Sequence, residues 1–416
     1  MRNFPWVGML AVYMLCLLID TYIFYDIRRM TSGNRRKVAL WIHGVVSGLC
    51  IALVTTVVCW PKNSTDNDLL PLMWMIYVLV SIYIPKIIYI IFSLIGRLFR
   101  FSRKGKPVYY GAYCGMALAL FAFGFLWWGV IFTRNELRVN RVNVESDRLP
   151  ASFDGFRIVQ FSDAHVGSRG DDVSFVAKMV DSINSLQPDL IVFTGDIVNR
   201  STHEMEPFLN VLSRLKAREG VYSVLGNHDY GDYADWRNPA ERDANNALMA
   251  AWQRQIGWRM LNNSRDFISR GNDSIVLIGV ENWGEPPFKQ YGSLDDAYSL
   301  SRDSLFNVND RRFKVLLSHN PEHWNREVSK VSNIDLTLSG HTHAMQFMLG
   351  GGNHKWSPAM WIYEQWGGLY ERKSSDGIPM RIYVNIGSGE VGFPSRLGSA
   401  KPEITEITLR RTAGKH

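Results

Sequence analysis

FSDAHVG, at residues 161–167, is the first of four short motifs that decide the fold of this chain. TGDIVN (194–199), LGNHD (225–229) and SGHTH (339–343) follow in order, and the run FKVLLSHN places His319 between the last two. Each motif closes a run rich in β-branched or aliphatic residues, which is typical of buried parallel strands. Because open α/β sheets build their sites where such strands give way to loops, we expect the polar residues of these motifs to meet at one sheet edge.

The side chains at these strand ends are of the types that hold two divalent metal ions. Carboxylate oxygens, imidazole nitrogens and one amide oxygen, without a thiolate, suit Mn, Fe or Zn. Asp163 and His165 stand two residues apart on an extended strand end and therefore point the same way. The carboxylate of Asp196 has two oxygens and can bridge both ions. His341 and His343 repeat the two-residue spacing, so the sequence predicts a two-metal centre.

In these motifs the chain resembles the calcineurin-like metallophosphoesterase superfamily, specifically its membrane-linked bacterial branch. The resemblance covers roughly residues 155–410, the size of one large domain. It implies a first metal held by Asp163, His165, Asp196 and His343, and a second held by Asp196, Asn227, His319 and His341. It also implies hydrolysis of a phosphoester or pyrophosphate bond by water that the two ions activate, with no side-chain nucleophile.

The resemblance gives catalytic roles to two residues that follow Asn227. His228 would face the substrate and stabilise or protonate the departing oxygen, and Asp229 would orient it. Nearby, Asn199 replaces an aspartate found in some relatives, which bears on substrate choice. Arg200 has two equal interpretations, a phosphate ligand or a solvated loop residue.

Other residues near the motifs carry weaker signals. His323 is expected either close to the site or in a helix-capping or surface role. Arg396, in GSGEVGFPSRLG (387–398), is expected to meet substrate because this segment resembles one near the active site in the membrane-linked branch. Taken singly, DAH and GNHD also occur by chance or as turns, whereas five elements in family order outweigh coincidence.

The first 135 residues hold an excess of apolar residues. Segments near 5–25, 38–60, 71–96 and 109–133 are each long enough to cross about 30 Å of hydrocarbon. The first lacks a cleavage site and is expected to remain in the membrane. We therefore divide the chain into four spans (1–135), a linker (136–154) and a phosphoesterase domain (155–416).

Charges between the spans predict an orientation. Basic residues cluster after the first span, at 28–37, and after the third, at 97–106, so these loops are expected in the cytoplasm. The 61–70 loop has one Lys and two Asp and is expected outside. The catalytic domain would then be extracytoplasmic, in a multi-pass protein of a bacterial inner membrane.

Charge and cysteine usage exclude other classes. Residues 1–108 contain 13 Lys and Arg against 4 Asp and Glu, a balance of +9, and the remainder 33 against 35, a balance of −2. The positive charge therefore belongs to membrane loops, and no nucleic-acid partner is expected. All four cysteines lie in or beside spans, so the catalytic domain has no disulfides. Asp20 and Lys86 lie within spans, and a structural pair or snorkelling is favoured over a proton relay.

The soluble part reads as a two-sheet α/β sandwich. Strands are expected at 157–163, 189–195, 221–225, 274–280, 313–318, 334–338, 381–386 and 403–409, with helices near 173–187 and 204–216. Two insertions, 230–260 and 344–373, would shape the substrate site. The second is rich in Trp, Tyr and Met, including Trp361 and Trp366, and core packing and contact with a lipid interface explain it equally well.

The sequence thus predicts a membrane-linked phosphoesterase acting on a lipid or lipid-linked substrate. One alternative is the same chemistry on a soluble nucleotide or an envelope-polymer phosphodiester. Another is a catalytically silent metal-binding sensory module, which the complete ligand set and the presence of His228 disfavour.

Overall fold

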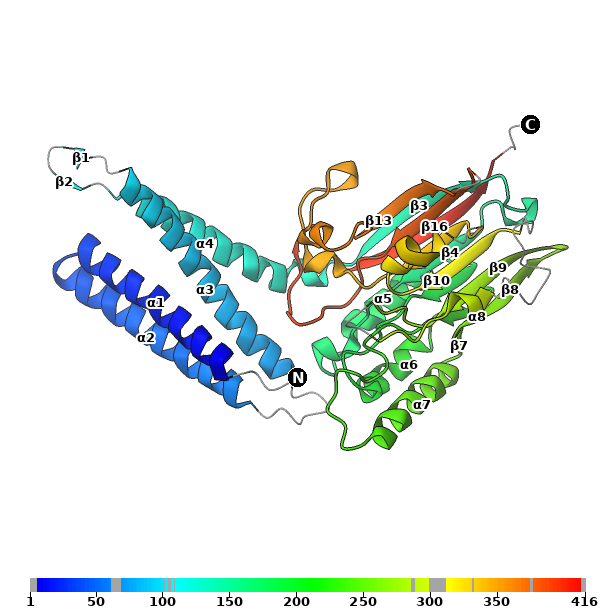
Figure 1. Cartoon of the computed structure of the whole chain (residues 1–416), viewed down its shortest axis with the longest axis horizontal. Coiled ribbons are helices and arrows are strands. Elements are labelled where there is room, and N and C mark those ends of the chain that lie inside the picture. The colour runs from blue at the N-terminus through cyan, green and yellow to red at the C-terminus, as the bar shows by residue number, and fades with distance from the viewer. Residues whose placement is uncertain are drawn as a thin grey trace. The chain divides into compact units, whose positions relative to one another are not determined.

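Figure 1 shows the computed structural model of the chain, which describes residues 6–60, 69–99, 102–103, 106–107, 109–285, 289–298, 312–330, 333–374 and 377–412. The chain divides into two compact units, and the main boundary in the sequence lies between Ile131 and Phe132. Long helices make up most of the first unit, and the second unit contains the large sheets.

The first unit contains the expected membrane spans. They are α1 (Trp6–Met30), α2 (Gly33–Cys59), α3 (Leu69–Leu98) and α4 (Tyr110–Ile131). Each is long and apolar enough to cross a bilayer, which takes about 20 residues. Between α3 and α4 in the sequence, β1 (Ser102–Arg103) pairs with β2 (Lys106–Pro107). Most of the expected external loop, and Arg100 and Lys104 of the expected cytoplasmic loop, lie outside the described residues.

Acidic side chains on α1 are paired with α3. Lys86 Nζ lies 2.6 Å from Asp20 Oδ1, so the pair that the sequence suggested is confirmed. Asp26, which is buried, accepts hydrogen bonds from Tyr89, Ser93 and Arg97 of α3. Ionisable groups inside an apolar bundle are costly unless paired. These contacts support a structural role for the two carboxylates.

Two six-stranded sheets form the frame of the second unit. The first has the order β3 (Arg138–Ser146), β16 (Glu403–Arg411), β4 (Arg157–Phe161), β5 (Leu190–Phe193), β6 (Val221–Ser223) and β7 (Trp258–Met260). The second has the order β13 (Gly368–Lys373), β14 (Pro379–Val384), β11 (Leu336–Ser339), β10 (Lys314–Ser318), β9 (Asp273–Val280) and β8 (Ser264–Arg270). A small parallel pair joins β12 (Phe347–Met348) to β15 (Leu397–Gly398).

The two sheets pack face to face with helices outside them (Figure 1). Val192 of β5, Leu277 of β9 and Leu317 of β10 belong to the apolar core between the sheets. The outer face of the first sheet is covered by α5 (Ser174–Ser185), α6 (Leu209–Leu212) and α7 (Pro239–Gln255). The second sheet packs against α8 (Leu294–Tyr298) and the turn Trp324–Val328. Strands covered on both faces need apolar residues throughout, and this layering confirms the predicted α/β sandwich.

Parallel pairing brings the motifs to one edge of each sheet. Within the first sheet β4, β5, β6 and β7 run parallel, and within the second so do β9, β10, β11 and β14. The loops that follow β4, β5, β6, β10 and β11 therefore leave from the carboxyl ends of parallel strands. These loops carry the residues that the sequence singled out.

The expected linker at 136–154 is part of the sheet, so that boundary was wrong. Residues 138–146 form β3, which pairs in parallel with β16 along its whole length. The sequence of β3, RVNRVNVES, is largely polar, and most of its residues are partly or fully exposed because the strand lies at a sheet edge. A polar edge strand of this kind resembles a linker in sequence. The edge strands β8 and β13 were missed for the same reason.

The helix expected near 204–216 is shorter and tighter than predicted. Thr202–Phe208 forms a 3₁₀ turn that leads into the single turn of α6. Pro207 has no backbone N–H to continue an α-helical pattern. Ser201 and Glu204 form a capping box at the start of the turn, which fixes where it begins.

Since β3 belongs to the sheet, a soluble fragment of residues 132–416 should be much more stable than one of residues 155–416. The shorter fragment loses the buried side chains of Val144, Leu149 and Phe153. At about 1.5–3 kcal/mol for each, this loss rivals the whole net stability of a domain. Urea unfolding of both fragments measures the difference. Equal midpoints would show that the strand contributes nothing.

Candidate metal centre

The structure brings together the polar residues that end the parallel strands. Asp163 follows β4 and Asp196 follows β5, while Asn227 lies beyond the end of β6. His319 follows β10 directly, and His341 lies two residues after β11. These residues converge because the loops that follow neighbouring parallel strands all leave a sheet at the same edge.

Asp163, His165 and His343 form the first group. Their ligand-type atoms all lie within 4.8 Å of one another, and all three residues are buried. His343 Nε2 is 3.3 Å from Asp163 Oδ1 and 3.1 Å from His165 Nε2. His165 Nδ1 lies 3.1 Å from the carbonyl oxygen of Val198, which fixes the ring and directs Nε2 inward.

Asp196, His319 and His341 form a second group of the same kind. His319 Nε2 lies 3.1 Å from Asp196 Oδ2 and 3.2 Å from His341 Nδ1. Asn227 joins this group, since its Oδ1 is 3.2 Å from His319 Nε2 while its Nδ2 donates to the hydroxyl of Tyr233. His319 Nδ1 faces the carbonyl of Thr194 at 2.8 Å, so Nε2 points inward here as well.

Asp196 connects the two groups. Its Oδ2 is 3.1 Å from His319 Nε2 of the second group and 3.8 Å from His165 Nε2 of the first. Its other oxygen accepts the backbone N–H of His228 at 2.8 Å. This placement is the one that a bridging carboxylate requires.

The donor set fits cations. Inward-facing lone pairs of imidazole and carboxylate repel one another unless a positive charge lies among them. Burial lowers the pKa of His319, but the negative charge of Asp196 outweighs burial and raises that pKa to about 9. Burial raises the pKa of Asp163, but His343 more than offsets this and lowers it to about 2. Two divalent ions would supply the same charge through nitrogen and oxygen ligands alone.

The backbone at the site is strained. Asp163, Asp196 and His341 have φ values of 50°, 63° and 76°, in the left-handed region that non-glycine residues avoid. His165 and His343 share this conformation, with φ of 39° and 50°. Each such residue costs on the order of 1–3 kcal/mol and persists only where its surroundings over-determine it, most often at functional sites.

Glycines allow the loops to approach the carboxylates. A Cβ on Gly226 would collide with the side chain of Asp196, and one on Gly340 would collide with Ser162 and Asp163. The Gly in each of the motifs LGNHD and SGHTH is therefore a packing requirement of the site.

His228 lies beside the first group, and its ring is oriented by a backbone carbonyl. Its Nδ1 is 2.7 Å from the carbonyl oxygen of Asn199, and its ring centroid lies 4.9 Å from that of His165 and 4.4 Å from that of Tyr233.

The expectation that Asp229 orients His228 was wrong. The carboxylate of Asp229 accepts the backbone N–H groups of Asp196, Ile197, Val198 and Gly226.

Asp229 therefore supports the loop that carries Asp196. Burial and the nearby charge of Asp196 raise the pKa of Asp229 to about 7. Four backbone donors on one buried carboxylate hold the loop in its left-handed turn and direct the Asp196 side chain toward both groups.

Asn199 and Arg200 are buried or partly buried parts of the same scaffold. Asn199 Oδ1 accepts from Ser168 and its Nδ2 donates to Glu204, while its carbonyl faces His228. Arg200 is buried and donates to the carbonyl of Tyr233, so it is not a solvated loop residue. His323 is fully buried between Ser318 and Glu327, so it has no surface role; it occupies the N-cap position of the turn Trp324–Val328 without a side-chain cap hydrogen bond.

Arg396 does not face open space where substrate could reach it. It is fully buried and donates to the carbonyls of Ile386, Gly389 and Ala400. Its Nη2 also lies 3.4 Å from Nδ1 of His343, on the side of that ring away from the first group. The expectation that it meets substrate is therefore replaced by a supporting role behind His343.

Glu390, in the same segment, anchors the loop that follows His165. It is fully buried and is paired with Arg134 at 2.9 Å and with Arg169 at 2.7 Å. Its backbone carbonyl accepts from Ser168. This cluster could not be predicted from the sequence, because its three charged residues are far apart along the chain.

Two tryptophans of the insertion 344–373, which the sequence analysis considered together, differ in their exposure. Trp366 is 6% exposed and packs with Met348, Ala359 and Ile386, whereas Trp361 is 75% exposed. Core packing thus explains one tryptophan and not the other. The insertion also supplies Tyr363, whose hydroxyl lies 3.2 Å from Nε2 of His341.

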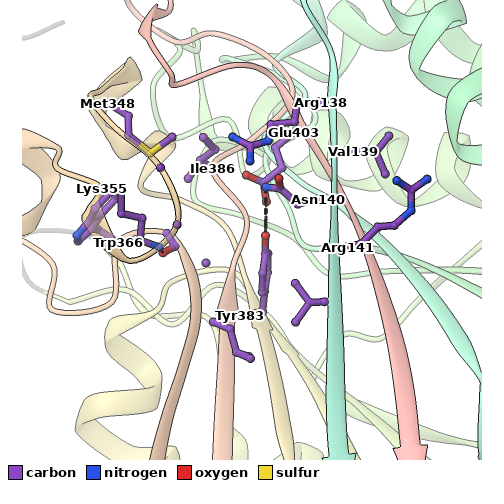
Figure 2. A pocket seen from close by; sticks show the side chains of 16 residues that line it. Arg138, Val139, Asn140, Arg141, Met348, Lys355, Trp366, Tyr383, Ile386 and Glu403 are labelled. Atoms are coloured by element: carbon purple, nitrogen blue, oxygen red, sulfur yellow. Dashed lines mark hydrogen bonds between the residues drawn. The ribbon is translucent and has the colours of Figure 1, made fainter.

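A separate cavity of about 380 Å³ lies along β3, beside Trp366 and Lys355 of the same insertion (Figure 2). Its wall includes Tyr383, whose hydroxyl donates to Glu403 at 2.6 Å, as the dashed line shows. None of the residues of the two metal-type groups lines it. The cavity is therefore distinct from the metal centre.

Comparisons with known proteins agree with this geometry. The family model described as calcineurin-like phosphoesterase matches residues 156–345, and the model described as probable calcineurin-like phosphoesterase, transmembrane domain, matches residues 3–134. The chain is 34% identical over 277 residues to an uncharacterized metallophosphoesterase, YkuE, of Bacillus subtilis, covering 65% of this chain and 84% of that one.

Two further relatives are similar over much of their length. A transmembrane protein with metallophosphoesterase domain from Danio rerio is 28% identical, covering 76% of this chain and 68% of that one. UDP-2,3-diacylglucosamine pyrophosphatase LpxG of Chlamydia muridarum is 27% identical, covering 53% of this chain and 74% of that one. The chain is thus a metallophosphoesterase with a membrane-spanning region, and it belongs to the calcineurin-like phosphoesterase family.

Proposed function

We propose that this protein hydrolyses a phosphoester or pyrophosphate bond of a lipid or lipid-linked substrate at the membrane surface. The observation that carries the proposal is the pair of ligand groups sharing Asp196, in a chain whose described residues also include four long apolar helices. The similarity to a pyrophosphatase whose named substrate carries two acyl groups supports the substrate class.

The proposed ligands are those implied by the motifs. Asp163, His165, Asp196 and His343 would hold one divalent ion, and Asp196, Asn227, His319 and His341 the other. Two such ions, Mn, Fe or Zn, would supply an activated water and charge stabilisation for an in-line displacement. The chain itself contributes the fixed ring orientations and the bridging carboxylate, so little reorganisation is required during the reaction.

His228 is the proposed acid or hydrogen-bond donor to the leaving oxygen. Its Nδ1 is occupied by the carbonyl of Asn199, which leaves Nε2 to face a substrate. Because the ring is partly buried and lies beside that of Tyr233, it is held in one orientation, as proton transfer requires.

A soluble nucleotide or an envelope-polymer phosphodiester would use the same centre, and a silent sensory module would bind metals without turnover. Purified full chain, reconstituted with Mn, should be tested on phospholipids, a polyprenyl pyrophosphate, nucleotides and bis-p-nitrophenyl phosphate. Preference for the lipid substrates supports the proposal. Preference for nucleotides, or metal binding without any turnover, contradicts it.

Asp196→Asn should abolish turnover and lower the bound metal content, because the bridging carboxylate sets both the charge and the spacing of the two groups. His228→Ala is the matched contrast: it should keep both metals and lose rate by roughly 10²- to 10⁴-fold. Metal analysis and steady-state kinetics on the same samples separate the two roles. Normal turnover of Asp196→Asn, or metal loss in His228→Ala, would reverse the assignments.

Asp229→Asn should destabilise the metal-free protein, since an amide offers one acceptor where a carboxylate served four backbone donors. The expected loss is about 3 kcal/mol. Asp172→Asn, an exposed acid that accepts one backbone N–H, is the control and should change stability by less than about 0.5 kcal/mol. Chemical unfolding in EDTA measures both. A similar effect of the two changes would rule out the supporting role of Asp229.

We further propose that the catalytic unit is extracytoplasmic, in a bacterial inner membrane, because basic residues cluster at 28–37 and 97–106. A reporter active only outside the cytoplasm should work when fused after His416 and fail when fused within 97–107. Reporter activity in whole cells, normalised to expression, tests this. The reverse pattern would place the metal centre on the cytoplasmic side.

A further inference from the structure

An apolar rim lies next to the metal centre. We use this name for Met345, Met360, Trp361 and Ile362, which are 49%, 48%, 75% and 63% exposed. Three of them are consecutive, and the 3₁₀ turn that carries Met360 and Trp361 (η9, Pro358–Trp361) packs against the turn that carries Met345 (η7, His343–Gln346). Single exposed apolar residues are ordinary, but a cluster of this kind marks a surface that contacts something.

The rim is held outward by a well-packed base. Ala344 and Ala359, which neighbour its members in sequence, are fully buried, and Ser357 donates to the carbonyl of Ala344 at 2.7 Å. The backbone N–H groups of Ile362 and Tyr363 both bond to the carbonyl of Ala359. Trp361 therefore projects from an ordered turn, and its ring makes a T-shaped contact with that of Trp356, with the ring centroids 5.7 Å apart.

The rim is joined to the metal centre at both of its ends. His343, of the first ligand group, is the first residue of η7 and lies two residues before Met345. Tyr363 follows Ile362 directly, and its hydroxyl lies 3.2 Å from Nε2 of His341, of the second group. Whatever contacts the rim is consequently close to the reacting centre.

The composition of the rim and the rest of the chain indicate the partner. Trp is enriched where proteins meet the headgroup region of a bilayer, and Met and Ile are apolar enough to enter the acyl boundary. The long segment of the second unit that carries the rim begins at Phe132, directly after the last residue of α4 in sequence. Because the spans tether this unit to a membrane permanently, lipid is present at a high effective concentration.

We propose that Met345, Met360, Trp361 and Ile362 insert into the boundary between headgroups and acyl chains of the membrane in which the spans lie. The phosphate of a bilayer lipid then reaches the metal centre while its acyl chains stay in the membrane. The delivery of a lipid phosphate to the metal centre rests on the proposed function, whereas insertion of the rim into the membrane does not.

The direct test compares wild type with Trp361→Phe, both as full chains in nanodiscs of phosphatidylcholine and phosphatidylglycerol. Lipids brominated near the ester end of the acyl chain quench nearby indoles. The chain has 14 Trp, so the signal is the difference between the two proteins, which isolates residue 361. Strong quenching of the difference spectrum is expected. Absence of quenching overturns the proposal, whether the rim faces water or is covered by protein.

The functional test uses Trp361→Ser combined with Ile362→Ser. KM for a polyprenyl pyrophosphate presented in nanodiscs should rise roughly tenfold, while kcat/KM for soluble bis-p-nitrophenyl phosphate should stay within about twofold of wild type. Phe267→Ser, a 41% exposed aromatic on β8, is the matched control and should change neither. Trp366→Ser, in the core, should lower the melting temperature and impair both reactions.

The outcomes separate insertion from substrate class. Quenching of residue 361 without lipid turnover leaves insertion standing and refutes the lipid-substrate function. An equal loss of both activities in the double variant, with a lowered melting temperature, makes the rim a folding element and overturns the proposal. If light scattering shows two chains for wild type and one for the double variant, the rim binds a second copy, and the proposal also fails.

Discussion

The catalytic unit depends on holding two carboxylates close together inside the protein. Asp196 shares one oxygen between two ligand groups, and Asp229 receives four backbone N–H groups from the Asp196 loop and from Gly226. Burial, and after it the charge of Asp196, raise the pKa of Asp229 to about 7. The left-handed backbone of Asp196 follows from the same arrangement, because its N–H must turn toward Asp229 while its side chain turns away. Positive charge between the ligand groups offsets this cost.

Strand ends could be predicted from the sequence, whereas side-chain partners could not. A buried parallel strand is a continuous apolar run, so the polar residue that terminates it is conspicuous, and Asp163, Asp196 and His319 were placed correctly at the ends of strands. Asp229 and Arg396 were misjudged because their partners are backbone groups, which leave no mark in the sequence. Trp361 and Trp366 lie five positions apart in an irregular insertion, and without a periodic pattern nothing in the sequence distinguishes the exposed side chain from the buried one.

One insertion serves several parts of the catalytic unit. Residues 344–373 supply Tyr363 to the second ligand group, Trp366 to a small apolar cluster, and a wall of the cavity beside β3 (Figure 2). The hydroxyl of Thr342 donates to the carbonyl of Trp366. This hydrogen bond ties the insertion to the segment between His341 and His343. A change within the insertion therefore acts on the ligands through short covalent and hydrogen-bonded connections.

The pairing of β3 with β16 sets the order in which the chain can complete its fold. The ion pair between Arg141 and Glu406 spans these two strands and joins residues 265 positions apart. β3 is made immediately after the last span, yet the edge of β16 on which it pairs is synthesised only after the other strands of both sheets. Until then β3 carries an unpaired row of backbone groups, and so does the neighbouring edge of β4. Such long-range closure slows folding and leaves the nascent unit open to non-native strand pairing, so this protein is exposed to aggregation during its biogenesis.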